Sequence, residues 1–333
     1  MAVISVIGSG GWGTALSVML SKNSHQVTLW SLFKEEIDAL EKDRENKLLK
    51  GVKIPKDIFL TSDLKEIPAS DVYVLAVPSF AIRSTARLLK NILKENDVVC
   101  NISKGLEEET LLRMSQVIKE ELPFCKLAVL SGPSHAEEVA RGIPTTNVVG
   151  SEDLELAKKL QDIFMNKSFR IYTSDDIIGM ELGGSLKNVI ALAAGCCDGM
   201  GLGDNTKAAL MTRGIAEMER LGVALGAKAS TFTGLTGFGD LIVTCTSMHS
   251  RNRRCGILIG QGKTAKEAIE EVGMTVEGYK TAAAAYMLSQ KVNVDMPIIT
   301  EIYNVLYKDK KATEAINDLM LRTKKNETEE VWS

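Results

Sequence analysis

Two polar stretches interrupt small, apolar surroundings in this chain, and each carries a lysine. Lys104 stands within residues 101–105, after an apolar run, and Lys187 lies among glycine, alanine and aliphatic residues. An ammonium group buried in such surroundings loses hydration, so its pKa should fall unless a carboxylate pairs with it. A lysine in that state can exchange protons near neutral pH. Lys187 is therefore the candidate acid–base group, with Lys104 as a second cation facing a ligand cleft.

A third polar stretch is rich in glycine and contains Asp240, which is followed by Ser250, Arg251 and Asn252. Asp240 is the candidate carboxylate partner of Lys187. Arg251 with Asn252 could hold a phosphate, because a guanidinium presents a fork of donors to such an anion.

Each of these residues also has a simpler interpretation. Lys104 could be a surface residue, Lys187 could extend to water from an interior helix, and Asp240 could only cap a helix. Arg251 stands close to two further arginines and could belong to a solvated basic turn. Whether these residues form a site or have these simpler roles depends on the helices and strands that position them.

A glycine-rich stretch near the start predicts a nucleotide site. Residues 8–13 read Gly-Ser-Gly-Gly-Trp-Gly, directly after an apolar run and directly before a helical pattern. In this context Gly8 permits a tight turn, Gly10 lets the backbone approach a pyrophosphate, and Gly13 lets helix and strand pack closely. The helix N-terminus then presents free N–H groups to the anion. With an anion-binding pair downstream, the pattern indicates a nucleotide-dependent enzyme acting on an anionic substrate.

The end of the expected second strand lacks the acidic residue that usually binds the ribose hydroxyls of NAD. Residues 30–34 read Trp-Ser-Leu-Phe-Lys. Without a carboxylate there, nothing repels the 2′-phosphate of NADP. Lys34 could attract this phosphate, or Lys34 could be only a solvated helix residue. We therefore expect tolerance of NADP and leave the preference between NAD and NADP open.

The first half of the chain alternates short apolar strands with helical stripes, whereas nearly all later patterns are helical. Strands are expected at residues 3–7, 26–30, 71–77, 97–102 and 126–130, with later ones at 148–149 and 169–172. Such alternation predicts a parallel sheet with right-handed crossovers. The predicted fold is α/β, with a Rossmann-like, doubly wound N-terminal domain (residues 1–177) and an all-helical substrate domain (residues 178–333). Ligands of such sheets bind beyond the carboxyl ends of the strands, so the second domain would close over that edge.

Composition narrows the class further. Apolar residues make up 45% and charged residues 25% of the 333 residues, and the net charge is −3 with no long basic block, which argues against a nucleic-acid partner. By its sequence, no apolar stretch approaches the ~20 residues of a membrane span. The six cysteines form no metal or disulfide framework and the three histidines are scattered, so we expect no metal site and reduced thiols, hence a cytoplasmic protein.

These residues resemble the bacterial-type NAD(P)-dependent glycerol-3-phosphate dehydrogenases over almost the whole chain. The matching motifs, in order, are residues 8–15, 103–105, 130–138, 184–188, 198–205, 234–241, 249–252 and 276–278. The resemblance implies hydride transfer between NAD or NADP and the pair sn-glycerol 3-phosphate and dihydroxyacetone phosphate. It also implies a supply of glycerol 3-phosphate for glycerophospholipid synthesis, and it is consistent with a homodimer, although no residue indicates an interface.

The same resemblance implies individual roles. Lys187 is implied as the proton acceptor when glycerol phosphate is oxidised, and Lys104 as a contact of both ligands. The residues implied to line the substrate site are Gly132, Ser134, Asp240, Ser250, Arg251 and Asn252. Those implied to contact the cofactor, beside the glycine turn, are Gly11, Trp12, Lys104, Ala136, Arg251 and Glu277.

Some positions depart from the family pattern. Relatives often carry serine at the position of Gly11, and His-Arg or Arg-Arg where this chain has Leu32 and Phe33. The second departure weakens any claim for a strong NADP preference. Two other functions stay open from the sequence: a hydroxyacid dehydrogenase with a carboxylate substrate on Arg251, and a cofactor-sensing protein without turnover.

Overall fold

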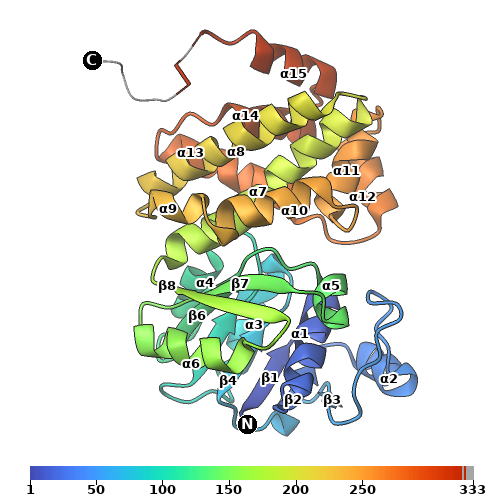
Figure 1. Ribbon diagram of the computed structural model, residues 1–333, viewed down its shortest axis with the longest axis vertical. Helices are drawn as coiled ribbons and strands as arrows, with labels where there is room; N and C mark the ends of the chain where they lie inside the picture. The colour runs from blue at the N-terminus through green and yellow to red at the C-terminus, as the bar shows by residue number, and fades with distance from the viewer. Residues whose placement is uncertain (325, 328–333) are drawn as a thin grey trace.

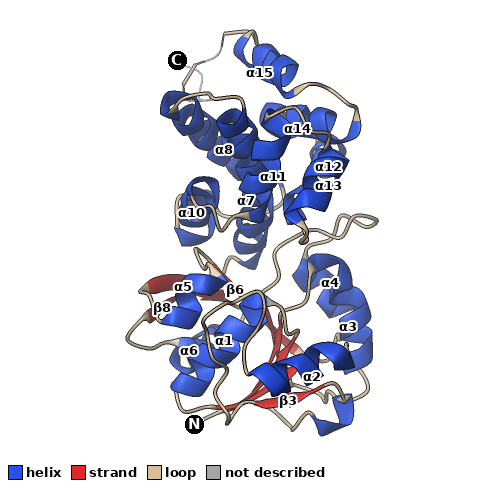
Figure 2. Ribbon diagram, turned by 90° about the vertical axis from the view of Figure 1, so that its right-hand side faces the viewer, coloured by secondary structure: helices blue, strands red, loops and turns tan. Residues whose placement is uncertain are grey.

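The computed structural model describes residues 1–324, 326 and 327, so the last residues of the predicted second domain lie outside the described part. Figure 1 shows two layers of different kinds, a sheet flanked by helices below and a body of helices above. The turned view in Figure 2 shows strands only in the lower body. The expected Rossmann-like domain followed by a helical domain is confirmed.

A single eight-stranded sheet has the order β3-β2-β1-β4-β5-β6-β7-β8. Its strands are β1 (Val3–Ile7), β2 (Gln26–Trp30), β3 (Phe59–Thr61), β4 (Val72–Leu75), β5 (Val98–Asn101), β6 (Lys126–Ser131), β7 (Thr145–Gly150) and β8 (Phe169–Ser174). The central strands are short runs of buried residues, as expected for a sheet covered on both faces. The predicted sheet was parallel throughout; six of the seven observed pairings are parallel, but β6 and β7 pair antiparallel.

Alternate residues of β4 belong to two different clusters of the core. Val72 and Val74 pack with the cluster that includes residues of α1 (Gly11–Lys22) and α6 (Leu154–Phe164). Tyr73 and Leu75 pack with residues of α3 (Ile82–Leu89) and α4 (Met114–Glu121) on the opposite face. The period of two along a strand thus divides the core between the two helical layers.

The remaining elements of this domain are short. They comprise α2 (Lys34–Asp43), α5 (Ala136–Arg141) and the 3-10 turns η1 (Leu64–Glu66) and η2 (Ser79–Ala81). The patterns did not predict β3 or α5. Helix α4 begins only at Met114, because the residues before it form a turn closed by the isolated bridge between Leu106 and Arg113.

Helix α7 (Ile177–Gly199) begins just after the last strand and forms the centre of the helical domain. Around it lie α8 (Asp204–Ala224), α9 (Ala229–Phe232), α10 (Asp240–Thr246), α11 (Arg251–Gly260), α12 (Ala265–Val272), α13 (Glu277–Lys291), α14 (Pro297–Tyr307) and α15 (Ala312–Met320), with a π-helical turn η3 (Leu235–Gly239) before α10. The sequence patterns did not predict α9, η3, α10 or α11.

The expectation that no apolar stretch approaches the length of a membrane span was wrong for α7. It is the one helix in the described part of the chain that is long and apolar enough, with 23 residues and a mean hydropathy of 1.3 over its best window. Of that window, 94% is buried inside the protein. Its apolar character is therefore explained by its place in the core, where neighbouring helices cover it on all sides.

Helices α7 and α11 approach each other backbone to backbone. A Cβ added at Gly195 would lie 2.1 Å from the carbonyl oxygen of Arg253, and one at Gly256 would lie 2.0 Å from that of Leu192. One turn further along, Gly199 and Gly260 repeat the arrangement, with added Cβ atoms 2.2 Å from backbone oxygens of the partner helix. Only residues without a side chain permit this distance between the two helices.

We expect Gly195→Ala to lower the free energy of unfolding by about 2–3 kcal/mol, because the methyl group must push two backbones apart. The matched control is Gly239→Ala, since Gly239 already has helical dihedral angles and an added Cβ there meets nothing closer than 3.6 Å. Urea unfolding followed by circular dichroism measures both. Equal stabilities of the two variants would contradict the close packing of α7 on α11.

Candidate active site

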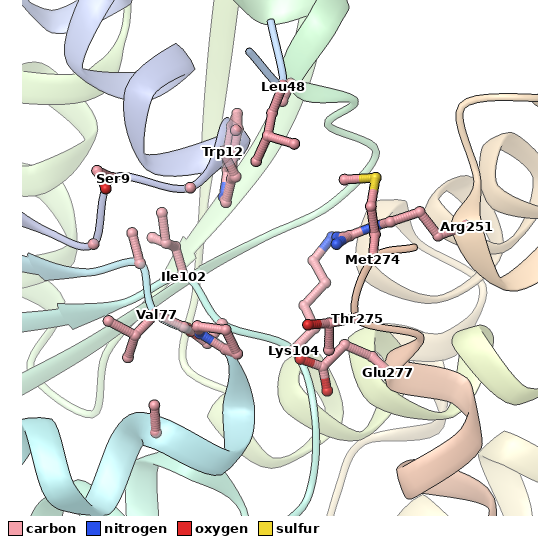
Figure 3. A pocket seen from close by; sticks show the side chains of 18 of the residues that line it. Ser9, Trp12, Leu48, Val77, Ile102, Lys104, Arg251, Met274, Thr275 and Glu277 are labelled. Carbon is pink, nitrogen blue, oxygen red and sulfur yellow. The ribbon is translucent and has the colours of Figure 1, made fainter. Parts of the chain in front are cut away.

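A pocket of about 1000 Å³ lies between the two domains. One wall comes from the turn between β1 and α1 and from the residues that follow β4 and β5, and the other comes from α7, α11 and α13. Figure 3 shows Ser9 and Trp12 on one side of this space and Arg251 on the other. The pocket lies at the carboxyl ends of the parallel strands, where doubly wound sheets bind their ligands.

The glycine turn has the backbone that a dinucleotide cradle requires. Gly8 has φ +124°, and a Cβ there would lie 2.8 Å from the backbone of Ala76. A Cβ at Gly13 would lie 2.0 Å from the carbonyl oxygen of Gly8, so this glycine lets α1 pack on the turn. A Cβ at Gly10, in contrast, meets nothing within 4 Å and would face the pocket. Gly8 and Gly13 thus serve the fold, and Gly10 leaves open space at a helix N-terminus, which fits a pyrophosphate.

The centre of the site is a carboxylate between two ammonium groups. Lys187 Nζ donates to Asp240 Oδ1 at 2.5 Å, and Lys104 Nζ donates to Asp240 Oδ2 at 2.6 Å. Lys187 also donates to Thr244 Oγ1 at 2.7 Å, and Lys104 donates to the carbonyl oxygen of Gly132 at 2.9 Å. Lys104 belongs to the sheet domain and the other charged groups to the helical domain, so this carboxylate links the two.

The structure excludes the simpler interpretations of these three residues. The side chain of Lys187 is 8% exposed and that of Asp240 is 1% exposed, so neither reaches bulk water. Lys104 is 19% exposed and ion-paired, not a free surface residue. Asp240 is the first residue of α10 and not its N-cap, which is Gly239, so it does not serve as a helix cap.

Burial lowers the pKa of Lys187 from its ordinary value to about 8. Removal from water disfavours the ammonium form, the charge of Asp240 opposes this shift, and the charge of Lys104 reinforces it. Near neutral pH this lysine can therefore both release and accept a proton, which is the property expected of an acid–base group.

The local fold around Asp240 explains how the pair forms. A Cβ at Gly183 of α7 would lie 2.6 Å from the carbonyl oxygen of Thr236 in η3, so α7 and the π-helical turn touch backbone to backbone. Lys187 stands one turn beyond Gly183 on α7, and Thr244 stands one turn beyond Asp240 on α10. The close approach brings all three polar groups within hydrogen-bond distance.

A second candidate anion site lies at the start of α11. Ser250 is the N-cap of this helix and accepts from the N–H of Arg253 at 3.2 Å. The exposed side chain of Arg251 makes no hydrogen bond or ion pair with any residue in the described part of the chain, and it projects into the pocket (Figure 3). A free guanidinium at a helix N-terminus suits a phosphate group. Arg251 is thus on a helix, not in the basic turn that the neighbouring arginines suggested.

Asn252 holds three helices together. Its Nδ2 donates to Asn188 Oδ1 on α7 at 2.9 Å, and its Oδ1 accepts from the N–H of Gly278 on α13 at 2.8 Å. Glu277, which precedes Gly278, is half-buried, and this removal from water raises the pKa of its carboxyl group. It accepts from Ser79 Oγ of the sheet domain at 2.6 Å. These bonds keep the walls of the pocket together.

Most of the expected site residues line one pocket. They are Gly8, Gly10, Gly11, Trp12, Lys104, Ser134, Ala136, Lys187, Ser250, Arg251, Asn252 and Glu277. Three others lie behind its wall. Gly13 packs under the turn, and Asp240 and Gly132 hold Lys104 from behind. No group of three His, Cys, Asp or Glu residues that could hold a metal occurs in the described part of the chain.

Two residues of the site were assigned no role from the sequence, although Asn188 belongs to the motif at residues 184–188. Thr244 and Asn188 line the pocket, where Thr244 accepts from Lys187 and Asn188 accepts from Asn252. We expected no carboxylate beyond the end of the second strand, because no acidic residue directly follows it in the sequence. In the structure a carboxylate from the next helix lies there. Glu36, on the first turn of α2, reaches this place, while Lys34 is bound to Asp38 at 2.8 Å from each carboxylate oxygen. Lys34 is thus a solvated helix residue.

Together, the fold and the site define a nicotinamide-nucleotide-dependent oxidoreductase with a separate helical substrate domain. The family model for the N-terminus of NAD-dependent glycerol-3-phosphate dehydrogenase matches residues 3–157, and the model for its C-terminus matches residues 176–317. The chain therefore belongs to the family of NAD-dependent glycerol-3-phosphate dehydrogenases.

Individual relatives agree with this assignment. The chain is 58% identical over 331 residues to a protein of Fusobacterium nucleatum named glycerol-3-phosphate dehydrogenase, NAD(P)+, covering 98% of this chain and 99% of that one. A protein of the same name from Clostridium perfringens is 55% identical over 329 residues, with 98% and 99% covered. The crystal structure of glycerol-3-phosphate dehydrogenase from Coxiella burnetii has a TM-score of 0.93 at 36% identity, covering 96% of this chain and 99% of that one.

The division of labour among the glycines can be tested. We expect Gly10→Val to weaken NADH binding by about tenfold or more, because the side chain would occupy the space left for the pyrophosphate. Stability should stay within about 0.5 kcal/mol, since an added Cβ meets no neighbour there. Titration of NADH fluorescence and thermal unfolding measure the two effects. Gly13→Ala is the contrasting variant and should unfold at a lower temperature than Gly10→Val, because its Cβ meets the backbone of Gly8. An unchanged NADH affinity in Gly10→Val would refute the binding of the pyrophosphate at the glycine turn.

Proposed function

We propose that this protein interconverts sn-glycerol 3-phosphate and dihydroxyacetone phosphate with NAD or NADP, and thereby supplies glycerol 3-phosphate for glycerophospholipid synthesis. The observation that carries the proposal is the buried Lys187, bonded to Asp240 and opening on a pocket that also contains the glycine turn and the free guanidinium of Arg251. The family membership and the printed names of the relatives support the same substrate pair.

In this proposal the pocket has two anion-binding ends. The turn at Gly10 and the N-terminus of α1 hold the pyrophosphate of the dinucleotide, and Arg251 with the N-terminus of α11 holds the phosphate of the substrate. When bound, the nicotinamide ring supplies the acceptor or donor of the hydride. The two ends hold both ligands in place, so the protein aligns the reacting carbon of the substrate with the nicotinamide ring. Such alignment contributes a large part of the rate enhancement.

Lys187 carries the proton. In the oxidation direction its neutral amine takes the proton of the C2 hydroxyl group, and in the reduction direction its ammonium returns that proton to the ketone oxygen. Lys104 adds a second positive charge, which stabilises negative charge that develops on the same oxygen. Asp240 touches both ammonium groups and keeps them at fixed positions. Thr244 accepts a second hydrogen bond from Lys187, which leaves the third N–H of the ammonium group for the substrate oxygen.

We also propose a cytoplasmic location and a homodimeric assembly. A cytoplasmic location is supported by the six cysteines, all of which are buried and unpaired, as small packing residues of a reducing compartment would be. The homodimer remains a prediction from the resemblance, and sedimentation equilibrium would test it.

We expect Lys187→Ala to lower kcat for reduction of dihydroxyacetone phosphate by about 10³-fold, the scale of general acid–base catalysis. The Kd for NADH should stay within about threefold, because the glycine turn and α1 are untouched. Stopped-flow absorbance of NADH gives the rate, and NADH fluorescence gives the Kd.

Lys158→Ala is the matched control, since Lys158 is an exposed lysine whose ion pair with Glu155 lies on the surface. It should behave as the unchanged protein does. If Lys187→Ala kept most of its turnover, Lys187 would not be the proton carrier.

The pH dependence should have opposite signs in the two directions. Oxidation needs the neutral amine, so its kcat should rise as pH increases through about 8, the pKa of Lys187. Reduction needs the ammonium form, so its kcat should fall across the same range. In Asp240→Asn the carboxylate that raises the pKa of Lys187 is gone, and the inflection should move to lower pH in both directions. Steady-state profiles with the same sign in both directions would contradict the assignment.

A further inference from the structure

The carboxylate of Glu36 lies at the junction of the glycine turn and the second strand. Its Oε2 accepts from Ser9 Oγ at 2.6 Å and from Ser31 Oγ at 2.7 Å. Ser9 belongs to the turn between β1 and α1, and Ser31 directly follows β2. Two serines from different parts of the nucleotide fold therefore hold one oxygen of this exposed side chain in place.

The other oxygen of Glu36 is available to a ligand. Its Oε1 makes no hydrogen bond with any residue in the described part of the chain, and Glu36 lines the same pocket as Gly8 and Gly10. In dinucleotide-binding folds, the acidic residue beyond the second strand accepts hydrogen bonds from the ribose hydroxyls. In this chain that group comes from the first turn of the following helix instead of the strand end.

The nearby cations are already engaged by other carboxylates. Lys34 donates to both oxygens of Asp38 on the same helix. Arg87 also lines the pocket, and its guanidinium lies 3.0 Å from Glu121. A phosphate group next to Glu36 would thus face a fixed negative charge, while Lys34 and Arg87 are already paired with carboxylates.

We infer that Glu36 makes the pocket selective for NAD(H) against NADP(H), an inference that rests on the nucleotide site proposed above. Oε1 accepts a hydrogen bond from the ribose hydroxyl of NAD(H), and the same oxygen repels the 2′-phosphate of NADP(H). The exposed side chains of Leu32 and Phe33 line the pocket beside this site and offer an apolar surface to the adenine ring. The two serines matter because they hold the repelling group where it cannot turn away.

The test is direct binding of NADH and NADPH to Glu36→Gln, measured by nicotinamide fluorescence at low ionic strength, where charge repulsion is least screened. The unchanged protein should bind NADH more tightly than NADPH. The variant keeps the shape of the side chain and loses its charge, so the ratio of the two Kd values should shift toward NADPH by about tenfold. Added salt should reduce this difference between the proteins.

Glu35→Gln is the matched control, because it removes the same charge from the neighbouring residue of the same helix, which does not line the pocket. It should leave the ratio within about twofold of the unchanged value. The inference is overturned if the unchanged protein prefers NADPH, or if Glu36→Gln alters both affinities by the same factor. The two claims can fail separately. Loss of NADH binding in Gly10→Val would support the nucleotide site, and an unchanged ratio of the two Kd values in Glu36→Gln would then refute only the selectivity.

Discussion

The site depends on one buried carboxylate shared by two ammonium groups. A lone charge in this position would cost several kcal/mol in lost hydration, and two lysines side by side would repel each other. Asp240 offsets both effects by bonding to Lys104 and Lys187 with separate oxygens. The group retains one net positive charge, and Lys187 keeps a pKa low enough to lose its proton. The contact between the domains comes from this arrangement, and the proposed proton transfer and the stabilisation of the ketone oxygen depend on it.

Close backbone contacts place these charges. Gly183 lets α7 touch η3, and Gly195 and Gly199 let it touch α11. Lys187 and Asp240 are therefore brought together by positions that have no side chain at all. The polar bonds of Asn252 to α7 and α13 then tie the start of α11 into the same unit. Buried polar groups stabilise the fold only where every hydrogen-bond partner is present. The stability of this domain is therefore sensitive to single substitutions in its interior.

The sequence predicted the elements whose signals are local. The turn at residues 8–13 stands between a strand and a helix, and β2 has the bounds that its apolar run predicted. The lysines could be identified because each interrupts an apolar stretch. The failures have a common cause, which is that the deciding contact comes from elsewhere in the chain. Helix α11 is hidden by three arginines near its start, and Glu36 looks like one of several exposed acids until the fold brings it to Ser9. The antiparallel β7 likewise depends on how the chain returns to β6, which no local pattern encodes.

The glycine contact between α7 and α11 has a consequence for how the enzyme moves. Lys187, the proposed proton carrier, and Arg251, the proposed phosphate ligand, stand on two helices that cannot slide or separate without breaking backbone contact. We therefore expect any motion of the helical domain to carry both groups through the same rotation. The distance between these two groups is then set within one rigid domain, whereas a closure of the domains changes their distance from the nucleotide-binding domain.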